Sequence, residues 1–244
     1  MTKNNHFHKL NCLLRDQAVN TSHVNEASIY QYAEMLARIE NVLVVVSDLR
    51  KGSSRIFSGG FGERLGLDGY TSENSIWEKE ILRMMSETEK EEKFIAELRF
   101  FHYLRRLPKH RKSECFLLSK LRFNDSFEVM HKMYYIFDEN METVLYAICV
   151  YSPMLFDFNG KSYIVNSITG IKEELTSATD NAIISRRERQ ILQLIDQGMK
   201  SIEIADALHI SKNTVSRHRQ EILAKLQVKN SIEACRLAKS MGLL

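Results

Sequence analysis

The feature that most constrains this chain is its last stretch, Ser185 to Leu244, where signals that start and stop helices recur at short intervals. Ser185-Arg-Arg-Glu188 has the spacing of a capping box, in which the serine hydroxyl and the glutamate each bond a free backbone amide. Asn230-Ser-Ile-Glu233 repeats that pattern, and Ser211 between them is a good N-cap. Gly198 and Gly242 stand where helices are expected to end. The segment therefore predicts a bundle of four short helices.

Apolar residues in this segment recur at helical spacing and leave the third helix with a basic outer surface. Val215, Ile222 and Leu226 are expected to face inward. Lysine and arginine are left outside at Lys212, Arg217, Arg219 and Lys225. Two short helices, a tight turn and a basic helix form a helix-turn-helix unit, whose second motif helix is narrow enough to enter the DNA major groove. A helical bundle with a solvated charged face, acting as a protein-binding adaptor, is the alternative.

The distribution of charge supports the first interpretation. From Asp180 onward the chain has 11 lysine and arginine residues against 7 aspartate and glutamate residues, whereas the rest has 23 against 24. The basic excess lies entirely in the C-terminal quarter, which indicates nucleic acid or another anionic surface as its partner.

The same segment resembles the LuxR/GerE-type DNA-binding domain over about 60 residues, a quarter of the chain. The matching positions are Glu188, Gly198, Glu203-Ile-Ala205, Leu208, Ile210-Ser211, Thr214-Val215, His218, Ile222, Lys225-Leu226 and Val228. Two departures concern the DNA sequence bound rather than the domain. Ser216 stands where lysine is common, and Lys200-Ser-Ile202 replaces the usual Ser-Asn-Lys order.

The resemblance implies a recognition helix within Ser211–Gln227 that reads double-stranded DNA. By that similarity the base-reading positions are Ser216, Arg217 and Gln220; arginine can donate two hydrogen bonds to guanine, and glutamine can pair with adenine. Thr214 and His218 match positions that touch phosphate. Further basic side chains expected near phosphate are Lys212, Arg219, Lys225 and Lys229. Phosphate contacts fix the register of a protein on DNA and make its affinity depend on salt.

The preceding three quarters of the chain alternate strand and helix signals. Helices are expected at Asn25–Glu40 and Ile76–Leu107, with turns and a small helix around the glycines Gly59, Gly60 and Gly62. Strands are expected at Val42–Asp48, Ser53–Ser58, Glu114–Phe123, Val129–Asp138, Thr143–Ser152 and, at an edge, Lys161–Thr169. The expected class is an α+β domain with an antiparallel sheet, followed by the all-α helix-turn-helix domain.

This order of elements resembles a PAS-type sensor domain, one antiparallel sheet with helices on one face. The expected organisation is N-terminal helices for dimerisation or flanking at 1–40, the PAS-like domain at 41–170, a linker at 171–182 and the DNA-binding domain at 183–244. If the sheet and helices enclose a ligand pocket, its lining candidates are Tyr134, Ile136, Tyr146, Ile148 and Val150. The alternative for these five residues is ordinary hydrophobic core.

Two other input domains fit less well. A phosphorylatable receiver is a doubly wound parallel sheet with an acidic pair after its first strand, whereas only Asp48 follows VLVVVS here. An acyl-homoserine-lactone domain has a clustered Trp/Tyr/Asp signature, and this chain has the single tryptophan Trp77. A quorum-sensing-type, ligand-responsive regulator is nevertheless kept as an alternative.

Neither a metal site, a cofactor nor an enzymatic centre is expected from sequence. The cysteines Cys12, Cys115, Cys149 and Cys235 form no close ligand spacing, and the histidines His102, His110 and His131 form no HxxxH or HExxH pattern. Without a signal sequence or an apolar run of about 18 residues, a soluble cytoplasmic protein is expected. The sequence thus predicts a homodimeric, DNA-binding transcriptional regulator that responds to an unknown signal, with no membrane segment.

Overall fold

A single antiparallel sheet organises the first three quarters of the chain in the computed structural model, which describes residues 10–14, 25–124, 127–176, 184–226, 228, 230–240 and 244. Its strands are β1 (Leu43–Asp48), β2 (Ser53–Ser58), β3 (Ser72–Glu73), β4 (Cys115–Phe123), β5 (Phe127–Phe137), β6 (Val144–Pro153), β7 (Ser162–Asn166) and β8 (Lys172–Glu174). Their order in the sheet is β3-β2-β1-β6-β5-β4-β7-β8. The two central neighbours β5 and β6 are long and pair from Val129↔Pro153 to Phe137↔Val144.

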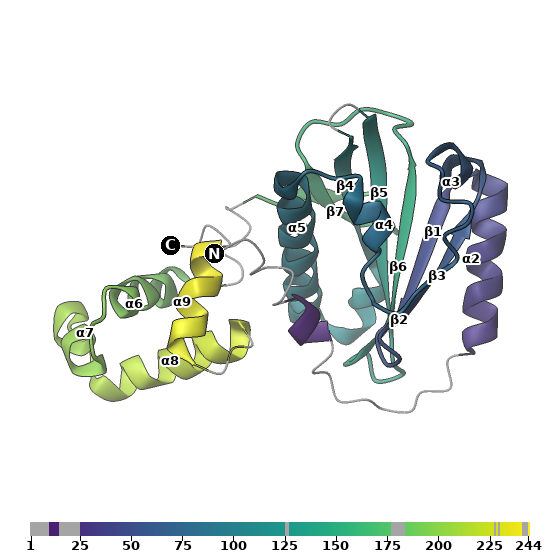
Figure 1. The fold of residues 1–244 in the computed structure, drawn as a ribbon. Helices are drawn as coiled ribbons and strands as arrows, with labels where there is room; N and C mark the ends of the chain where they lie inside the picture. The colour runs from purple at the N-terminus through teal and green to yellow at the C-terminus, as the bar shows by residue number, and fades with distance from the viewer. Residues whose placement is uncertain are drawn as a thin grey trace.

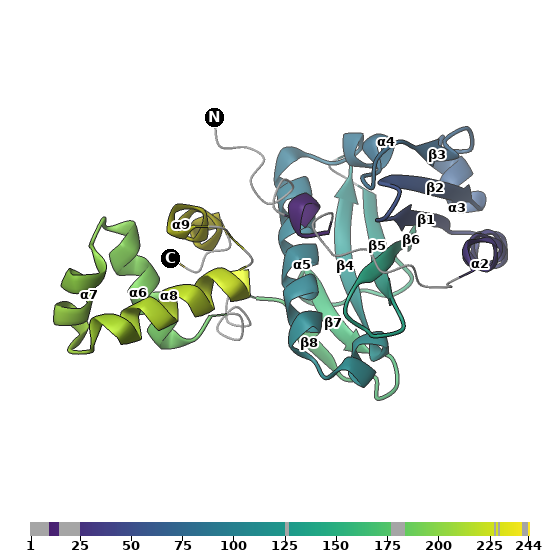
Figure 2. The same cartoon turned by 90° about the horizontal axis from the view of Figure 1, so that it is seen from below.

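Helices cover both faces of the sheet, as Figures 1 and 2 show. On one face lie α3 (Gly60–Arg64), α4 (Lys79–Arg83) and α5 (Glu87–Arg106). On the other lies α2 (Glu26–Glu40), whose buried Ala33 and Ala37 join a separate core cluster. Alternate residues of the central strands therefore enter different cores, because side chains along a strand point to opposite faces. Along β6, Cys149 belongs to the α5 side and Ile148 to the α2 side.

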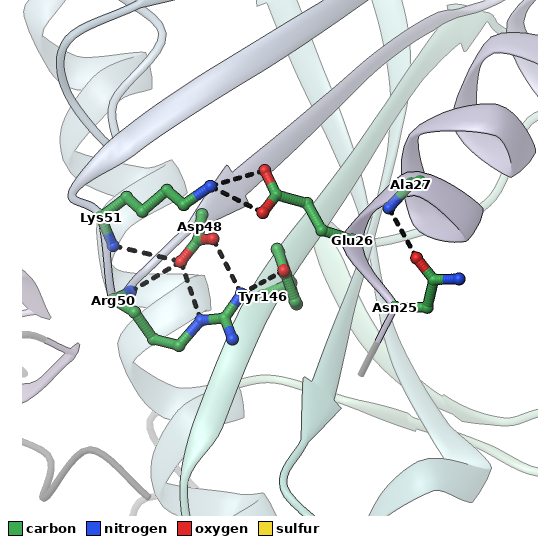
Figure 3. Close-up of polar contacts among 7 residues, drawn as sticks. All are labelled: Asn25, Glu26, Ala27, Asp48, Arg50, Lys51 and Tyr146. Carbon is green, nitrogen blue, oxygen red and sulfur yellow. Dashed lines mark hydrogen bonds and ion pairs between the residues drawn. The ribbon is translucent and has the colours of Figure 1, made fainter. Parts of the chain in front are cut away.

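The N-terminal end of α2 is fastened to the turn between β1 and β2 (Figure 3). Asp48 accepts bonds from the Arg50 guanidinium, at 2.9 Å from Nη2 to Oδ2, and from the backbone amides of Arg50 and Lys51. Arg50 also donates to the Tyr146 hydroxyl, and Lys51 Nζ lies 2.6 Å from Oε2 of Glu26 on α2. Asp48 thus stabilises the turn between β1 and β2. The antiparallel sheet differs from the doubly wound parallel sheet of a receiver domain.

The C-terminal part is helical, with α6 (Arg186–Asp196), α7 (Ser201–Leu208), α8 (Lys212–Leu226) and α9 (Ser231–Ser240). The capping box of α6 is formed, since Glu188 N donates to Ser185 Oγ and Ser185 N donates to Glu188 Oε2. The principal contacts of these helices are with one another, and Figure 1 shows them as a lobe beside the sheet. Gly198 lies two residues after the end of α6 and has φ +85, a conformation that favours glycine.

Most predicted elements are confirmed, with three corrections. The helix expected at Ile76–Leu107 is two helices, because Ser86 caps a new helix by accepting from Glu89 N. β3 and β8 were not predicted; β8 lies in the segment expected to be a linker and pairs with β7, which is therefore not the edge strand expected at Lys161–Thr169. The third correction is the placement of helices on both faces rather than one. The end of α9 expected at Gly242 lies outside the described residues.

Among the residues that the structure describes, no helix is both long enough and apolar enough to cross a bilayer.

Candidate nucleic-acid interface

Helix α8 presents two contrasting sides. Val215, Ile222 and Leu226 are buried against the neighbouring helices. On the opposite side lie the exposed residues Lys212, Asn213, Ser216, Arg217 and Gln220, which form an exposed strip at helical spacing. A helix is held firmly by such a buried side while its outer strip stays available to a partner.

All three base-reading candidates lie on this exposed strip. Gln220 lies four residues after Ser216 and three after Arg217, so it shares a helix face with each of them and lies between them on the strip. Arg217 Nε lies 3.1 Å from Glu221 Oε1, with 73% of its side chain exposed. An exposed ion pair of this kind contributes little stability, so the guanidinium can exchange Glu221 for another acceptor at small cost.

Thr214 and His218 lie at the edge of the strip and are partly buried. The Thr214 hydroxyl lies 2.9 Å from the Ser211 hydroxyl, and the Thr214 amide donates to Ser211 Oγ at 3.1 Å. This confirms Ser211 as the cap of α8. His218 Nδ1 lies 3.2 Å from Glu221 Oε2. Lys212 is exposed in the first turn, where its ammonium is accessible to solvent.

Two of the basic candidates have partners within the bundle. Arg219 donates to Ser201 Oγ at 2.8 Å and to Ser231 Oγ at 2.9 Å, which ties α8 to the first residues of α7 and α9. Lys225 Nζ lies 2.7 Å from both carboxylate oxygens of Glu188 on α6. A phosphate would have to share these side chains with their present partners. Lys229, the remaining candidate, lies outside the described residues.

Glu188 is the buried acidic centre of the bundle, with a side chain 1% exposed. Burial alone would raise its pKa, but the hydrogen bonds from Lys225 and from the Ser185 amide outweigh burial and lower the pKa. The carboxylate is therefore charged at neutral pH and neutralised locally by Lys225. This pair stabilises the bundle that presents the exposed strip.

Asn213 is a member of the strip that was not among the site residues predicted from the sequence. It is exposed, and it lies three residues before Ser216 and four before Arg217. Helical periodicity alone would have found it, because residues at i, i+3 and i+4 share a helix face. Its amide can donate and accept, as base-edge recognition requires.

The five pocket candidates in the sheet come together, but on the α2 side. Tyr134, Ile136, Tyr146, Ile148 and Val150 belong to the core cluster that includes Ala33 and Ala37 of α2. Some of them line a groove of about 340 Å³, whose lining is Tyr32, Leu36, Glu40, Lys132, Tyr134, Ile148 and Val150. The side chains that face α5 are instead those at the intervening positions of the same strands, such as Met133 on β5 and Cys149 on β6.

Comparison with known families concerns the helical part. Residues 182–238 match the model of a family described as GerE, bacterial regulatory proteins, luxR family. The match spans α6, α7 and α8 and most of α9, so the similarity to this family is confined to the C-terminal part of the chain.

Among curated relatives, the uncharacterized response regulatory protein YgeK of Escherichia coli is 40% identical over 86 residues, covering 34% of this chain and 57% of that protein. The putative positive transcription regulator of virulence factors BvgA of Bordetella pertussis is 39% identical over 62 residues, 25% of this chain and 30% of that protein. The transcriptional activator protein EsaR of Pantoea stewartii subsp. stewartii is 33% identical over 92 residues, 37% of each chain. This chain thus spans from about a third to just over half of these relatives' lengths.

Solved structures show only a distant likeness. A phage VqmA–DPO complex has a TM-score of 0.33 at 13% identity, covering 89% of this chain and 87% of that one. A structure of Escherichia coli SdiA has a TM-score of 0.28 at 15% identity, covering 97% and 98%. Scores this low carry no argument about fold or function.

Proposed function

We propose that this protein is a sequence-specific, DNA-binding transcriptional regulator. The observation that carries the proposal is the exposed strip of α8 within a luxR-type helix-turn-helix domain. In that arrangement α8 enters the major groove, with Ser216, Arg217 and Gln220 against base edges. Asn213, on the same strip, is added to these base readers.

Phosphate contacts are proposed at the first turn of the strip and along its edge. Lys212 is the principal candidate because it is exposed in the first turn of α8. Thr214, His218, Arg219, Lys225 and Lys229 are kept as further candidates. Since Lys225 and Arg219 already hold α6, α7 and α9, their first role is to set the angle at which α8 is presented.

A homodimer is proposed for the intact protein, with a PAS-like N-terminal domain supplying the contact. Support comes from strand order, in which β2-β1-β6-β5-β4 form a continuous antiparallel core. It also comes from α2, whose outer side exposes Tyr32, Met35 and Ile39 at 62%, 53% and 73%. Exposed apolar side chains gathered on one helix are typical of an association surface. A dimer places two recognition helices on half-sites about one DNA turn apart.

The decisive experiment measures duplex affinity for the intact protein against salt concentration, after selection of the preferred duplex from a random pool. Arg217→Ala is expected to cost roughly 1–3 kcal/mol of binding and to relax preference at one base position. Lys212→Ala is expected to weaken all sequences alike and to reduce the salt slope by about one.

Arg236→Ala is the matched control, because Arg236 is an exposed arginine of the same domain on α9. It removes the same charge without touching the exposed strip. Unchanged duplex binding by both Arg217→Ala and Lys212→Ala would favour the adaptor alternative, in which the helical domain binds another protein.

A ligand-responsive regulator is the second candidate, favoured by the groove beside α2. Its volume of about 340 Å³ lies within the range of small-molecule sites. A ligand there would act only by binding one arrangement of the dimer better than another. Val150→Trp should fill the groove with the larger side chain. Adding cell extract, as a source of the ligand, should then change the DNA affinity of the wild type but not that of Val150→Trp.

A further inference from the structure

The interface between α5 and the sheet contains a group of buried polar side chains that DNA binding does not use. Glu78, Lys93, Glu97 and His131 are each at most 2% exposed. Glu97 and Cys149 line a cavity of about 20 Å³, together with Ser47, Trp77 and Met133. This volume accommodates one water molecule or a single ion and is too small for an organic ligand.

Three of these side chains are arranged as metal ligands. One ligand atom each from Glu97, His131 and Cys149 lies within 4.8 Å of the others. The ligand atoms of a tetrahedral zinc site are about 3.3–3.8 Å apart, given metal–ligand bonds of about 2.0–2.3 Å. Side-chain shifts of about 1 Å are therefore enough to bring the three onto one ion. They come from α5, β5 and β6, elements that are packed against one another.

His131 gives an independent reason to expect a ligand. It is completely buried, and neither of its ring nitrogens has a hydrogen-bond partner among the described residues. Its ring is held in place by stacking on Tyr151, with centroids 4.7 Å apart. A buried imidazole with both nitrogens unsatisfied is costly unless something else bonds to it.

The local charges also leave room for a cation. The ammonium of Lys93 faces both carboxylates of this cluster, with Nζ 2.5 Å from Glu97 Oε1 and 3.9 Å from Glu78 Oε2. Two buried carboxylates therefore share one ammonium. Glu78 Oε1 accepts from Tyr151, whereas Glu78 Oε2 has no hydrogen-bond partner among the residues the structure describes.

We propose that Glu97, His131 and Cys149 bind a Zn²⁺ ion beneath α5. Nitrogen and sulfur ligands favour zinc over magnesium or calcium, which prefer sets of oxygen ligands. Zn²⁺ displaces the thiol proton of Cys149, which leaves to solvent, and Glu97 exchanges the ammonium of Lys93 for the metal. Lys93 then turns to the unsatisfied oxygen of Glu78. The charges balance: Zn²⁺ and Lys93 supply three positive charges against Glu78, Glu97 and the thiolate.

The test uses the intact protein and added Co²⁺ or Zn²⁺ alone. Co²⁺ is expected to bind once per chain and to produce the charge-transfer absorption of a cobalt–thiolate bond, and Zn²⁺ is expected to displace it. Cys149→Ser should abolish that absorption and lower Zn²⁺ affinity by at least the roughly 10–100-fold that loss of an outer-shell partner costs, since it removes a ligand itself. Cys115→Ser is the matched control, since Cys115 is also a buried cysteine of the same sheet but lies outside the three-residue group.

His131→Phe keeps the stacking on Tyr151 and removes both ring nitrogens, so it should also lose the metal. A second readout guards against variants that fold poorly: Zn²⁺ should raise the unfolding temperature of the wild type and of Cys115→Ser but not of Cys149→Ser. Absence of the thiolate absorption in the folded wild type, or its persistence in Cys149→Ser, overturns the proposal. Neither readout depends on DNA binding.

Discussion

Single residues in the helical domain show how far local sequence signals reach. The Ser185–Glu188 capping box could be predicted because its partners are three residues apart. The ties that Arg219 makes to Ser201 and Ser231 could not, because they depend on how α7, α8 and α9 pack. Lys225 lies on the outside as expected, with 42% of its side chain exposed, but its bond to Glu188 could not be predicted for the same reason. A helical pattern indicates which side of a helix is polar but not which partner approaches it.

Lys225→Met is therefore expected to destabilise the helical domain. It keeps the length of the side chain but leaves the buried Glu188 carboxylate without its ammonium. The loss should be about 1–2 kcal/mol, moderated because Lys225 is 42% exposed. Urea unfolding followed through helix content measures it. Lys212→Met, which changes an exposed lysine of the same helix, should stay within about 0.5 kcal/mol of the wild type.

The same pair predicts a dependence on pH. Folding lowers the pKa of Glu188 below the ordinary glutamate value of 4.5, because Lys225 and the Ser185 amide bond its carboxylate. A group whose pKa is lowered by folding gives stability that is fully present above the unfolded value and is lost as pH falls through the folded value. Unfolding free energies of the wild type should thus fall below pH 4.5, and more steeply than those of Lys225→Met. Parallel curves for the two proteins would contradict this assignment.

At the level of elements, the junction between α2, β1 and α3 depends on close backbone approach. A Cβ on Gly59 would lie 2.0 Å from the Ala37 carbonyl oxygen at the end of α2. The run Gly59, Gly60 and Gly62 was interpreted as a turn with a small helix, which is correct for the chain path. Gly59 and Gly62 also let α2 and the strands β1 and β2 pack closely against this segment. No local signal in the sequence reveals these contacts.

Gly59→Ala should for this reason displace α2 and cost about 1–3 kcal/mol of unfolding free energy, measured by thermal and urea unfolding. Gly69→Ala serves as the control in the same loop region, because a Cβ there has no neighbour within 4 Å. Equal stability of both variants would show that the α2 junction can relax at no cost.

Strand alternation could be predicted from sequence, but the choice of face could not. The five candidates on β5 and β6 were correctly grouped as sharing one side of the sheet. Which helices cover that side depends on the path of the chain between β2 and β4, which sends α3–α5 to the other side. Glu97, His131 and Cys149 were missed because three separate elements bring them together.

At the level of the whole molecule, α2 is the surface on which dimerisation can be tested. Ile39→Glu should leave the stability of the monomer unchanged, because Ile39 is 73% exposed. It should weaken self-association by at least about tenfold, measured by sedimentation equilibrium. Binding to duplexes with two half-sites should fall with it, while binding to a single half-site should not. Ile168→Glu, at an equally exposed isoleucine between β7 and β8, is the control; identical sedimentation of both variants would move the interface elsewhere.

Strand β6 separates the two hydrophobic cores of the sheet domain. Its successive residues Ile148 and Cys149 belong to the cores on opposite faces of the sheet, so the strand is a partition one residue thick. Close-packed interiors transmit small shifts instead of absorbing them. A movement of about 1 Å at Cys149 would therefore be felt by Ile148 and Val150 in the floor of the groove beside α2. A chemical change at Cys149 in the core beneath α5 is therefore expected to change the shape of the groove beside α2.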